Sequence, residues 1–364
     1  MRRIEPWLLV IAVFVLPTID AACAKRQLEV IRIGIPGVIY ASGKPIKFIY
    51  ETVPDRFLKE EFRADKVTIQ WEMVPSGGPG LNEALASGGV DFVYYGDFPA
   101  VIGKGEGIDT KLVLPGSRGQ NSYLVVAPNS TAASLADLKG KRITFTRGRP
   151  NQLAFDRLAT LSGFNESDFQ IINMPAVDGD AALASHGVDA VFGAEGYLLE
   201  KRHIGKIIWS TRDKPLDWKF TAELFVLTSF RDRYPDATAR VVKAFLQTSY
   251  YVSLPQNRAD VLEQMTMGYM PYDVVVEEYH GLPLKNWMVP VFDPFIRAHY
   301  QGVIDYMLKN KMIRKGFSVD DWFDTSFADA ALKDLKLENY WPRADAHGHP
   351  SPQSITAGEE SASK

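Results

Sequence analysis

The sequence predicts an α/β protein of two lobes, each with a largely parallel sheet that helices cover on both faces. Short β-rich runs alternate with helical stretches along most of the chain, and this order is typical of open parallel sheets. The 364 residues suffice for two domains of about 100–200 residues each. From Asp236 to Lys336 the patterns become mostly helical, which predicts a helical C-terminal part.

Runs of alternating or continuously apolar residues mark the expected strands. The first, Val30–Ile35, ends in a Pro-Gly loop, and the second, 66–74, leads into the turn PSGGPG at 75–80. The following helix should stop at Gly88-Gly89, because glycine disfavours a helix interior. A further helix is expected at 98–103. The remaining expected strands are 90–94, 110–114, 123–127, 142–146, 169–174, 188–192, 204–209 and 224–228.

The composition excludes several classes of protein. Hydrophobic residues make up 46% of the chain and charged residues 23%, which argues against global disorder. A formal net charge of −3 gives no electrostatic signature for nucleic acid. One cysteine excludes a disulfide scaffold and a cysteine-based metal site. No apolar run in the body of the chain reaches the about 18–20 residues of a membrane span.

The first 24 residues read as a secretory signal peptide. Two arginines precede an apolar run at Trp7–Pro17, and Ala22-Cys23-Ala24 offers small residues for cleavage after Ala24. We therefore expect a periplasmic protein. The alternative is a lipoprotein acylated at Cys23, although Asp20 fits the motif for acylation poorly.

Three strand-to-helix junctions are candidate ligand sites, because ligands of open α/β sheets bind where the strands end and helices begin. They are the PSGGPG turn, Tyr94–Pro99 and Phe145–Gln152. Tyr94 and Tyr95 should point to opposite faces of the sheet, so at most one is expected to line a cleft. Asp97 is a good helix N-cap, and capping is favoured over ligand contact for it.

The segments ALASGGVD at 84–91, GDFP at 96–99, SLADLKGKRI at 134–143 and VDA at 188–190 together resemble solute-binding proteins of bacterial ABC importers. The closest group is the binders of aliphatic sulfonates, taurine and nitrate, over about residues 30–310. The resemblance implies the type II periplasmic-binding-protein fold, a Venus-flytrap of two lobes that closes on a small solute, and no catalysis, cofactor or metal. It implies partnership with an ABC permease and its ATPase, and a monomer.

The resemblance, with the signal-peptide pattern and the polar, Pro/Ser-rich tail, predicts a division of the chain. The signal peptide is 1–24, lobe one is 25–121 and 222–340, lobe two is 122–221, and 341–364 is a disordered tail. Hinges are expected where the chain crosses between the lobes, near 119–122 and 220–223.

The ligand contacts of the family map onto the junctions of this sequence. Sulfonate binders carry a Ser-rich run where this chain has Arg149-Pro150-Asn151-Gln152, and a guanidinium at Arg149 would bind two oxygens of an anion at once. Glu195 at a helix start would suit an amine or amide on the ligand. The expected ligand-binding residues are Tyr40, Ser42, Ser76, Gly77, Gly78, Tyr95, Gly96, Asp97, Ser122, Arg147, Gly148, Arg149, Asn151, Gln152, Glu195, Tyr197 and Thr221.

The expected function is capture of a small anionic solute, an organosulfonate or a taurine-like or nitrate-like anion. An alternative on the same fold is a binder of a thiamin-precursor-like pyrimidine or an aromatic acid, with Tyr40, Tyr95, Tyr197 or Trp218 stacking on the ring. A pyrimidine-synthase enzyme of this fold would carry a Cys-rich motif, whereas the one cysteine lies in the signal. Neither a G-x-S-x-G nor an H-E-x-x-H motif occurs.

Overall fold

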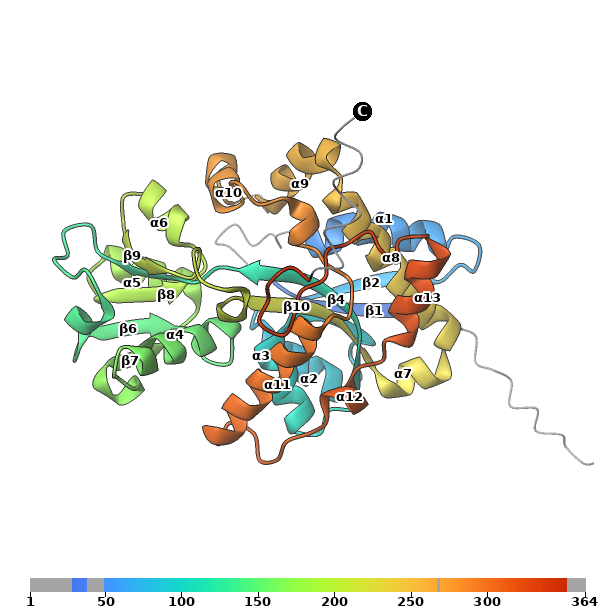
Figure 1. Ribbon diagram of the computed structural model, residues 1–364, viewed down its shortest axis with the longest axis horizontal. Helices are drawn as coiled ribbons and strands as arrows, with labels where there is room; N and C mark the ends of the chain where they lie inside the picture. Colours follow the sequence, from blue (N-terminus) through green and yellow to red (C-terminus); the bar gives the residue numbers. More distant parts are fainter. Residues whose placement is uncertain (1–27, 38–48, 267–268, 352–364) are drawn as a thin grey trace, which may run out of the picture.

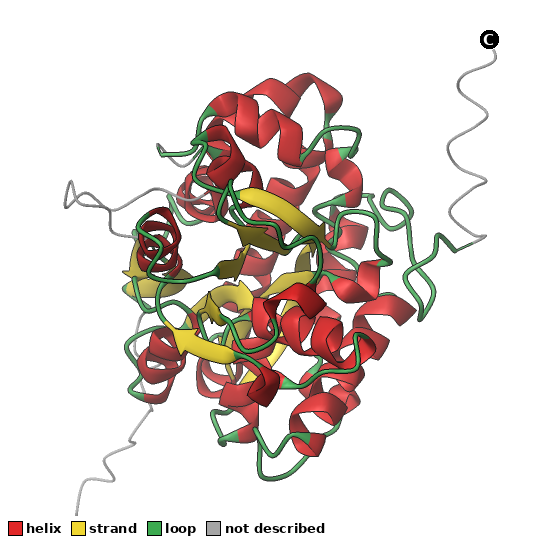
Figure 2. Cartoon of the chain, turned by 90° about the vertical axis from the view of Figure 1, so that its left-hand side faces the viewer, coloured by secondary structure: helices red, strands yellow, loops and turns green. Residues whose placement is uncertain are grey.

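The protein consists of two five-stranded sheets with helices packed on their faces (Figure 1). The computed structural model describes residues 28–37, 49–266 and 269–351. The expected signal peptide and the candidate residues Tyr40 and Ser42 lie outside the described residues. Figure 2 shows the strands in the interior with helices around them.

The first sheet has the strand order β2-β1-β3-β10-β4. β1 runs parallel to β2 and β3, while β10 is antiparallel to β3 and β4. The strands are β1 (Val30–Pro36), β2 (Thr68–Val74), β3 (Phe92–Gly96), β4 (Thr110–Gln120) and β10 (Phe220–Leu227).

The second sheet, on the left in Figure 1, has the order β7-β6-β8-β5-β9. β6 is parallel to β7 and β8, and β5 is antiparallel to β8 and β9. The chain passes between the sheets twice, from β4 to β5 and from β9 to β10. The strands are β5 (Tyr123–Val126), β6 (Arg142–Phe145), β7 (Gln170–Asn173), β8 (Ala190–Gly193) and β9 (Lys206–Ser210).

Successive strand residues enter separate cores on opposite faces of each sheet, as the period of two requires. In the first sheet Tyr94 packs with α1, α8 and α13, whereas Tyr95 packs with α2, α3 and α11. In the second sheet Leu124 packs with α4, and Tyr123 with α5 and α6. The helices named so far are α1 (Ile49–Glu61), α2 (Gly78–Ala86), α3 (Asp97–Gly105), α4 (Pro150–Leu161), α5 (Ala176–Ala184), α6 (Gly196–Lys201), α8 (Pro235–Ser253), α11 (Pro294–Lys309) and α13 (Ser326–Asp334).

The predicted fold class is confirmed, and the helices of the C-terminal part lie where the sequence places them. Each sheet is mixed, because β10 and β5 run against their neighbours, and an apolar run does not reveal strand direction. β4 extends to Gln120, beyond the predicted end at 114, because its pairing with β10 resumes at Ser117 after an irregularity at the Pro-Gly segment. No helix was expected at α1, which contains Pro54.

The predicted disorder of the tail from residue 341 is wrong as far as residue 351. Trp341 is buried, and the backbone N–H of Ala344 donates to Oδ2 of Asp293 at 2.9 Å. Burial of an indole removes a large apolar area from water, so this segment packs although its sequence is polar and proline-rich.

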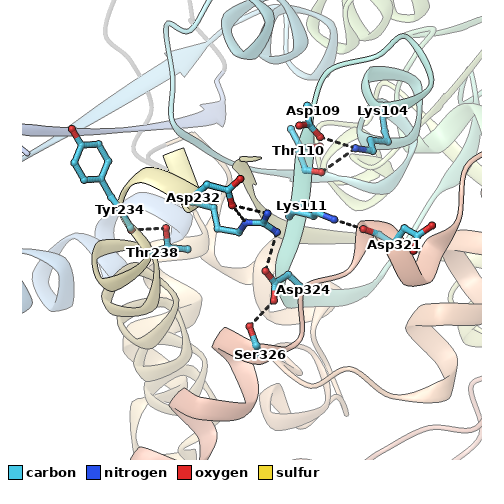
Figure 3. A network of polar contacts seen from close by, with 11 residues as sticks. Lys104, Asp109, Thr110, Lys111, Asp232, Tyr234, Thr238, Asp321, Asp324 and Ser326 are labelled. Carbon is cyan, nitrogen blue, oxygen red and sulfur yellow. Dashed lines mark hydrogen bonds and ion pairs between the residues drawn. The ribbon is translucent and has the colours of Figure 1, made fainter. Parts of the chain in front are cut away.

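The C-terminal helices are fastened to the first sheet by a polar network (Figure 3). Arg231 in α7 (Thr228–Arg233) binds Asp324, which lies between α12 (Val319–Trp322) and α13, at 3.1 Å. Lys111 in β4 donates to the backbone oxygen of Asp321 in α12. In the described part of the chain, no helix is both long and apolar enough to span a membrane.

Candidate functional site

A cavity of about 310 Å³ lies between the two sheets. Its walls include the ends of β3 and β10 from the first sheet and of β6 and β8 from the second. Two further helices, α9 (Arg258–Met265) and α10 (Tyr272–Glu278), close it on another side. The cavity thus lies at the strand-to-helix junctions, where the sequence predicted a ligand.

Four helices present their N-terminal ends to this cavity. The lining includes Gly78 of α2, Gly96 at the N-cap of α3, Asn151 of α4 and Ala176 of α5. The first turn of a helix carries N–H groups without intrahelical partners and a partial positive charge. Their convergence makes this part of the wall suited to an anion.

Arg149 adds a full positive charge to the same wall. It is the N-cap residue of α4, and its guanidinium approaches Gly77, which precedes α2. Its Nε is buried and has no hydrogen-bond partner among the described residues. Burial lowers the pKa of Arg149, and the charge of Glu195 opposes that shift. The guanidinium therefore has an unused donor beside the cavity.

Glu195 stands at the N-cap of α6 and also lines the cavity. Its Oε2 accepts a hydrogen bond from the N–H of Ala194 at 3.1 Å. Burial raises the pKa of Glu195, and Arg149 opposes the shift. The neighbouring Asp180 has its pKa raised to about 7, chiefly by burial and further by Glu195. A protonated Glu195 would be a hydrogen-bond donor to an anion.

The junctions of the two sheets touch beside the cavity. A Cβ added to Gly96 would stand 2.7 Å from Cγ of Pro150, so only glycine lets α4 approach this closely. Further along, the hydroxyl of Tyr306 in α11 donates to Asp156 in α4. The structure is therefore closed on this side.

On another side, α10 reaches across to the second sheet. Glu278 accepts hydrogen bonds from Nδ2 of Asn121 at 2.9 Å and from the hydroxyl of Tyr123 at 2.5 Å. Arg212 donates to the hydroxyl of Tyr197 at 2.8 Å and to the backbone oxygen of Glu277 at 3.0 Å. Burial raises the pKa of Glu278, and the hydrogen bonds from Tyr123 and Asn121 oppose the shift. The second sheet and its adjoining loops thus hold α10 in place.

Seven of the predicted ligand-binding residues line the cavity. They come from both sheets, as a solute gripped between two lobes requires. Tyr94 lines it as well as Tyr95, so the expectation that at most one of them would do so is wrong; both lie where β3 ends. The seven are Gly78, Tyr95, Gly96, Arg149, Asn151, Glu195 and Tyr197.

Three other predicted residues, Arg147, Gly148 and Gln152, are hydrogen-bonded to partners outside the cavity. Arg147 lies two residues from Arg149 but forms a two-pronged ion pair with Glu166, at 3.1 and 2.6 Å. The side-chain oxygen of Gln152 accepts a hydrogen bond from the backbone N–H of Gly148 at 3.0 Å, so these two residues bind each other. None of the three lines the cavity.

The prediction that Asp97 binds the ligand is wrong, because its side chain is buried and does not line the cavity. Its Oδ2 lies 2.5 Å from Nε2 of His299, and its Oδ1 accepts from the N–H of Phe98 at 2.6 Å. The N-cap of α3 is Gly96, not Asp97. Asp97 thus holds α3 against α11.

The remaining predicted residues lie behind or beside the wall. Ser122, between β4 and β5, and Thr221, near the start of β10, are buried and do not line the cavity. Ser76 is exposed, with its hydroxyl close to Gly80, and Gly77 contacts Arg149 without lining the cavity. Trp218 packs on Trp209, with ring centroids 5.8 Å apart, away from the cavity.

One whole wall of the cavity was missed by the sequence analysis. It is mainly apolar, and it comes from α9, α10 and the residues around them. The helical pattern of this region was visible, but nothing local in it indicates that these helices cross to the cavity. The missed residues include Ile49, Met265, Tyr269, Met270, Val274, Val275, Glu278, Tyr279, Leu282 and Trp287.

The family description "NMT1/THI5 like" matches residues 67–252, which is half of the chain and covers the junctions described above. This chain belongs to the NMT1/THI5-like family. The match runs from β2 to the end of α8 and so includes both passages between the sheets.

Two similar proteins are named as sulfonate-binding proteins. The solved structure of a periplasmic sulfonate-binding protein of an ABC transporter from Methylobacillus flagellatus is 34% identical, with a TM-score of 0.75 over 88% of this chain and 98% of that one. An aliphatic sulfonates-binding protein of Bacillus subtilis is 26% identical over 312 residues, 85% of this chain and 90% of that protein.

The same fold also occurs in an enzyme. The desulfurization enzyme DszB, solved in complex with biphenyl-2-sulfinic acid, superposes with a TM-score of 0.64 over 84% of this chain and 99% of that one. Its sequence is 14% identical, so this likeness shows the fold alone. The relatives with the higher identities are the binding proteins.

Proposed function

We propose that this protein is the periplasmic solute-binding component of an ABC importer and that it captures an organosulfonate. The observation that carries the proposal is the wall at which four helix N-termini and the unpaired Nε of Arg149 face one cavity. A sulfonate group has three oxygens that share one negative charge. The wall supplies a complementary charge and several donors at once.

In this proposal the residues of both sheets hold the anionic head. Arg149 and the start of α4 bind it from the second sheet, and the backbone at Gly78 and Gly96 binds it from the first. A ligand that bridges both sides stabilises the closed arrangement by the difference in its affinity for the closed and open forms. The permease would then recognise the closed form, and the two chain crossovers would act as hinges.

The chemistry of the cavity wall supports binding over catalysis. Among the described residues that line it there is no serine, cysteine or histidine, the side chains that most often serve as nucleophile or general base. Of the two lining carboxylates, Glu278 is occupied by Asn121 and Tyr123, and Glu195 accepts from the N–H of Ala194. A solute held here would leave unchanged.

The test is a thermal-shift screen followed by titration calorimetry of the purified mature protein. Sulfonates, nitrate, aromatic carboxylates and pyrimidines of similar size are compared, because a ligand raises the unfolding temperature by mass action whatever its chemistry. We expect saturable one-to-one binding of a sulfonate and recovery of the same compound after release. Binding of pyrimidines alone, or release of a desulfonated product, would overturn the proposal.

A further inference from the structure

Residues 341–351, which we call the C-terminal strap, fold against both places where the chain crosses between the sheets. The strap is the dark red loop of Figure 1. Its first residue, Trp341, is buried in a core of the first sheet. Further along, Ala344 and Pro350 pair in an antiparallel bridge, which closes the segment into a loop. The strap therefore has a fixed anchor and a defined shape.

The strap is joined to the first crossing, from β4 to β5, through Asp293. Oδ2 of Asp293 accepts hydrogen bonds from the N–H of Ala344 at 2.9 Å and from Nη1 of Arg118 at 2.8 Å. Arg118 lies in β4, two residues before the strand ends at Gln120. The side chains of Arg118 and Asp293 are 5% and 0% exposed, so loss of either partner would leave a buried charge unpaired. One carboxylate thus holds the strap and the strand that enters the first crossing together.

The strap meets the second crossing, from β9 to β10, at Leu216. Gly348 has a φ of +84°, and a Cβ placed on it would stand 2.8 Å from Cβ of Leu216. Leu216 also faces Gly119 in β4, where an added Cβ would stand 3.4 Å from Cδ1 of Leu216. The leucine of the second crossing therefore contacts both the strap and the strand that enters the first.

The second crossing is in turn tied to α4, the helix that begins at the cavity. Nη1 of Arg157 in α4 donates to the backbone oxygen of Asp217, the residue after Leu216, at 2.7 Å. The N-cap of the same helix is Arg149, which lines the cavity. No residue of the strap, all of which the structure describes, lines the cavity itself. The strap thus contacts the crossings that connect the sheets, and not the site.

We propose that the C-terminal strap braces both crossings in the closed arrangement and so sets the affinity for the solute from outside the cavity. The inference rests on the function proposed above, because it requires that the solute binds the closed form. A loop anchored in the first sheet by Trp341 favours the position of the second crossing in which Leu216 meets Gly348. Without the strap the closed form is less populated, and the apparent Kd rises as the binding-competent fraction falls.

The experiment compares two mature chains by calorimetry. One ends at Ser351 and keeps the strap, and the other ends at Ala344 and keeps only its anchor at Trp341; urea unfolding measures the stability of each. Ethanesulfonate and hexanesulfonate are the probes. The shorter chain should bind both about three- to thirtyfold more weakly, the size of an indirect effect on coupling. The factor should be the same for both probes, because a shift in closure multiplies every Kd alike.

Two results would overturn the inference while sulfonate binding stands. They are equal Kd values in the two chains, and a loss of affinity that differs between the two probes, which would indicate a change in the cavity itself. Failure of the longer chain to bind any sulfonate would instead overturn the proposed function.

A point variant tests the same contact in a chain of full length, so that the inference does not depend on the shorter chain folding. Gly348→Ala places a methyl group against Leu216, and the strap or the crossing must shift. Gly163→Ala is the matched control, since Gly163 has a φ of +80° and nothing lies within 4 Å of its Cβ position. Both should lose similar stability from backbone strain, whereas only Gly348→Ala should raise Kd, by one factor for both sulfonates. Equal Kd values in the two variants would show that the strap does not govern closure.

Discussion

The guanidinium of Arg149 packs directly against Gly77: a Cβ placed on that glycine would stand 2.6 Å from Nη2 of the arginine. Arg149 lies in the loop before α4, which follows the second sheet, and Gly77 lies in the loop before α2, which follows the first sheet. Gly77 also has a φ of +67°, which L-residues with a side chain adopt only at a cost. The position of the cation thus depends on a glycine in the opposite junction.

The variant Gly77→Ala should displace Arg149 and weaken sulfonate binding about tenfold or more, the effect of impairing a charged hydrogen bond. Gly140→Ala is the matched control, because Gly140 has a φ of +73° and nothing lies within 4 Å of its Cβ position. Both variants should lose similar stability from backbone strain, whereas only Gly77→Ala should lose affinity by calorimetry. An affinity loss of the same size in both would show that strain, not displacement of the arginine, is responsible.

Arg149→Ala should weaken sulfonate binding about ten- to hundredfold, since a hydrogen bond to a charged group contributes about 1.5–3 kcal/mol. Arg147→Ala removes the same charge two residues away, where the side chain is paired with Glu166 instead of facing the cavity. Its Kd should match that of the wild type. Titration of both variants with one sulfonate decides the matter, and unchanged binding in Arg149→Ala would remove this residue from the site.

These two arginines show how far the sequence could predict the site. The loop between β6 and α4 was identified because a strand, a glycine and an early proline follow one another. Arg147 does not face the cavity because it forms an ion pair with Glu166, which lies beyond the end of α4. Local spacing does not contain such a partner, and so the sequence predicted Arg149 as the anion-binding group but also placed Arg147 and Gln152 among the ligand-binding residues.

The mainly apolar wall formed by α9 and α10 marks a second limit of prediction from sequence. The strands of both sheets follow from apolar periodicity, and their junctions follow from glycine, proline and capping residues. The position of α10 instead depends on long-range contacts: Glu278 binds Asn121 and Tyr123, residues more than 150 positions earlier. Its sequence indicates a helix but not the surface that the helix covers.

The network in Figure 3 should contribute to stability without contributing to binding. Arg231→Met removes the ion pairs of Arg231 with Asp232 and Asp324; because these groups are partly exposed, the expected loss is about 1 kcal/mol in the free energy of unfolding. Arg233→Met is the control, since the guanidinium of Arg233 lies over the ring of Tyr234 and is not the partner of Asp232 or Asp324 in their ion pairs. Urea unfolding measures the loss. A change in sulfonate Kd in Arg231→Met would contradict the separation of this region from the site.

The contact between Asp156 and Tyr306 should make ligand binding depend on pH. Asp156 lies in α4 and Tyr306 in α11, so their hydrogen bond joins the two sides beside the cavity. Burial raises the pKa of Asp156 to about 7; the Tyr306 hydroxyl and Arg147 oppose the shift, and Glu166 adds to it. A carboxyl that holds its proton more tightly in this contact than in water stabilises the contact fully below the ordinary pKa of an aspartate, about 4, and this stabilisation is lost as the pH rises through the raised pKa of about 7.

If ligand binding requires this closed contact, the Kd of the wild type for a sulfonate should rise as the pH increases from about 6 to about 8. Asp156→Asn cannot ionise, and its amide oxygen can still accept from Tyr306, so its Kd should change less. The ratio of the wild-type Kd to the variant Kd should therefore increase across this range, whatever other groups titrate in both proteins. Calorimetry at several pH values gives that ratio directly. A ratio that stays constant would show that Asp156 keeps one protonation state in the open and closed forms, and that this contact does not govern closure.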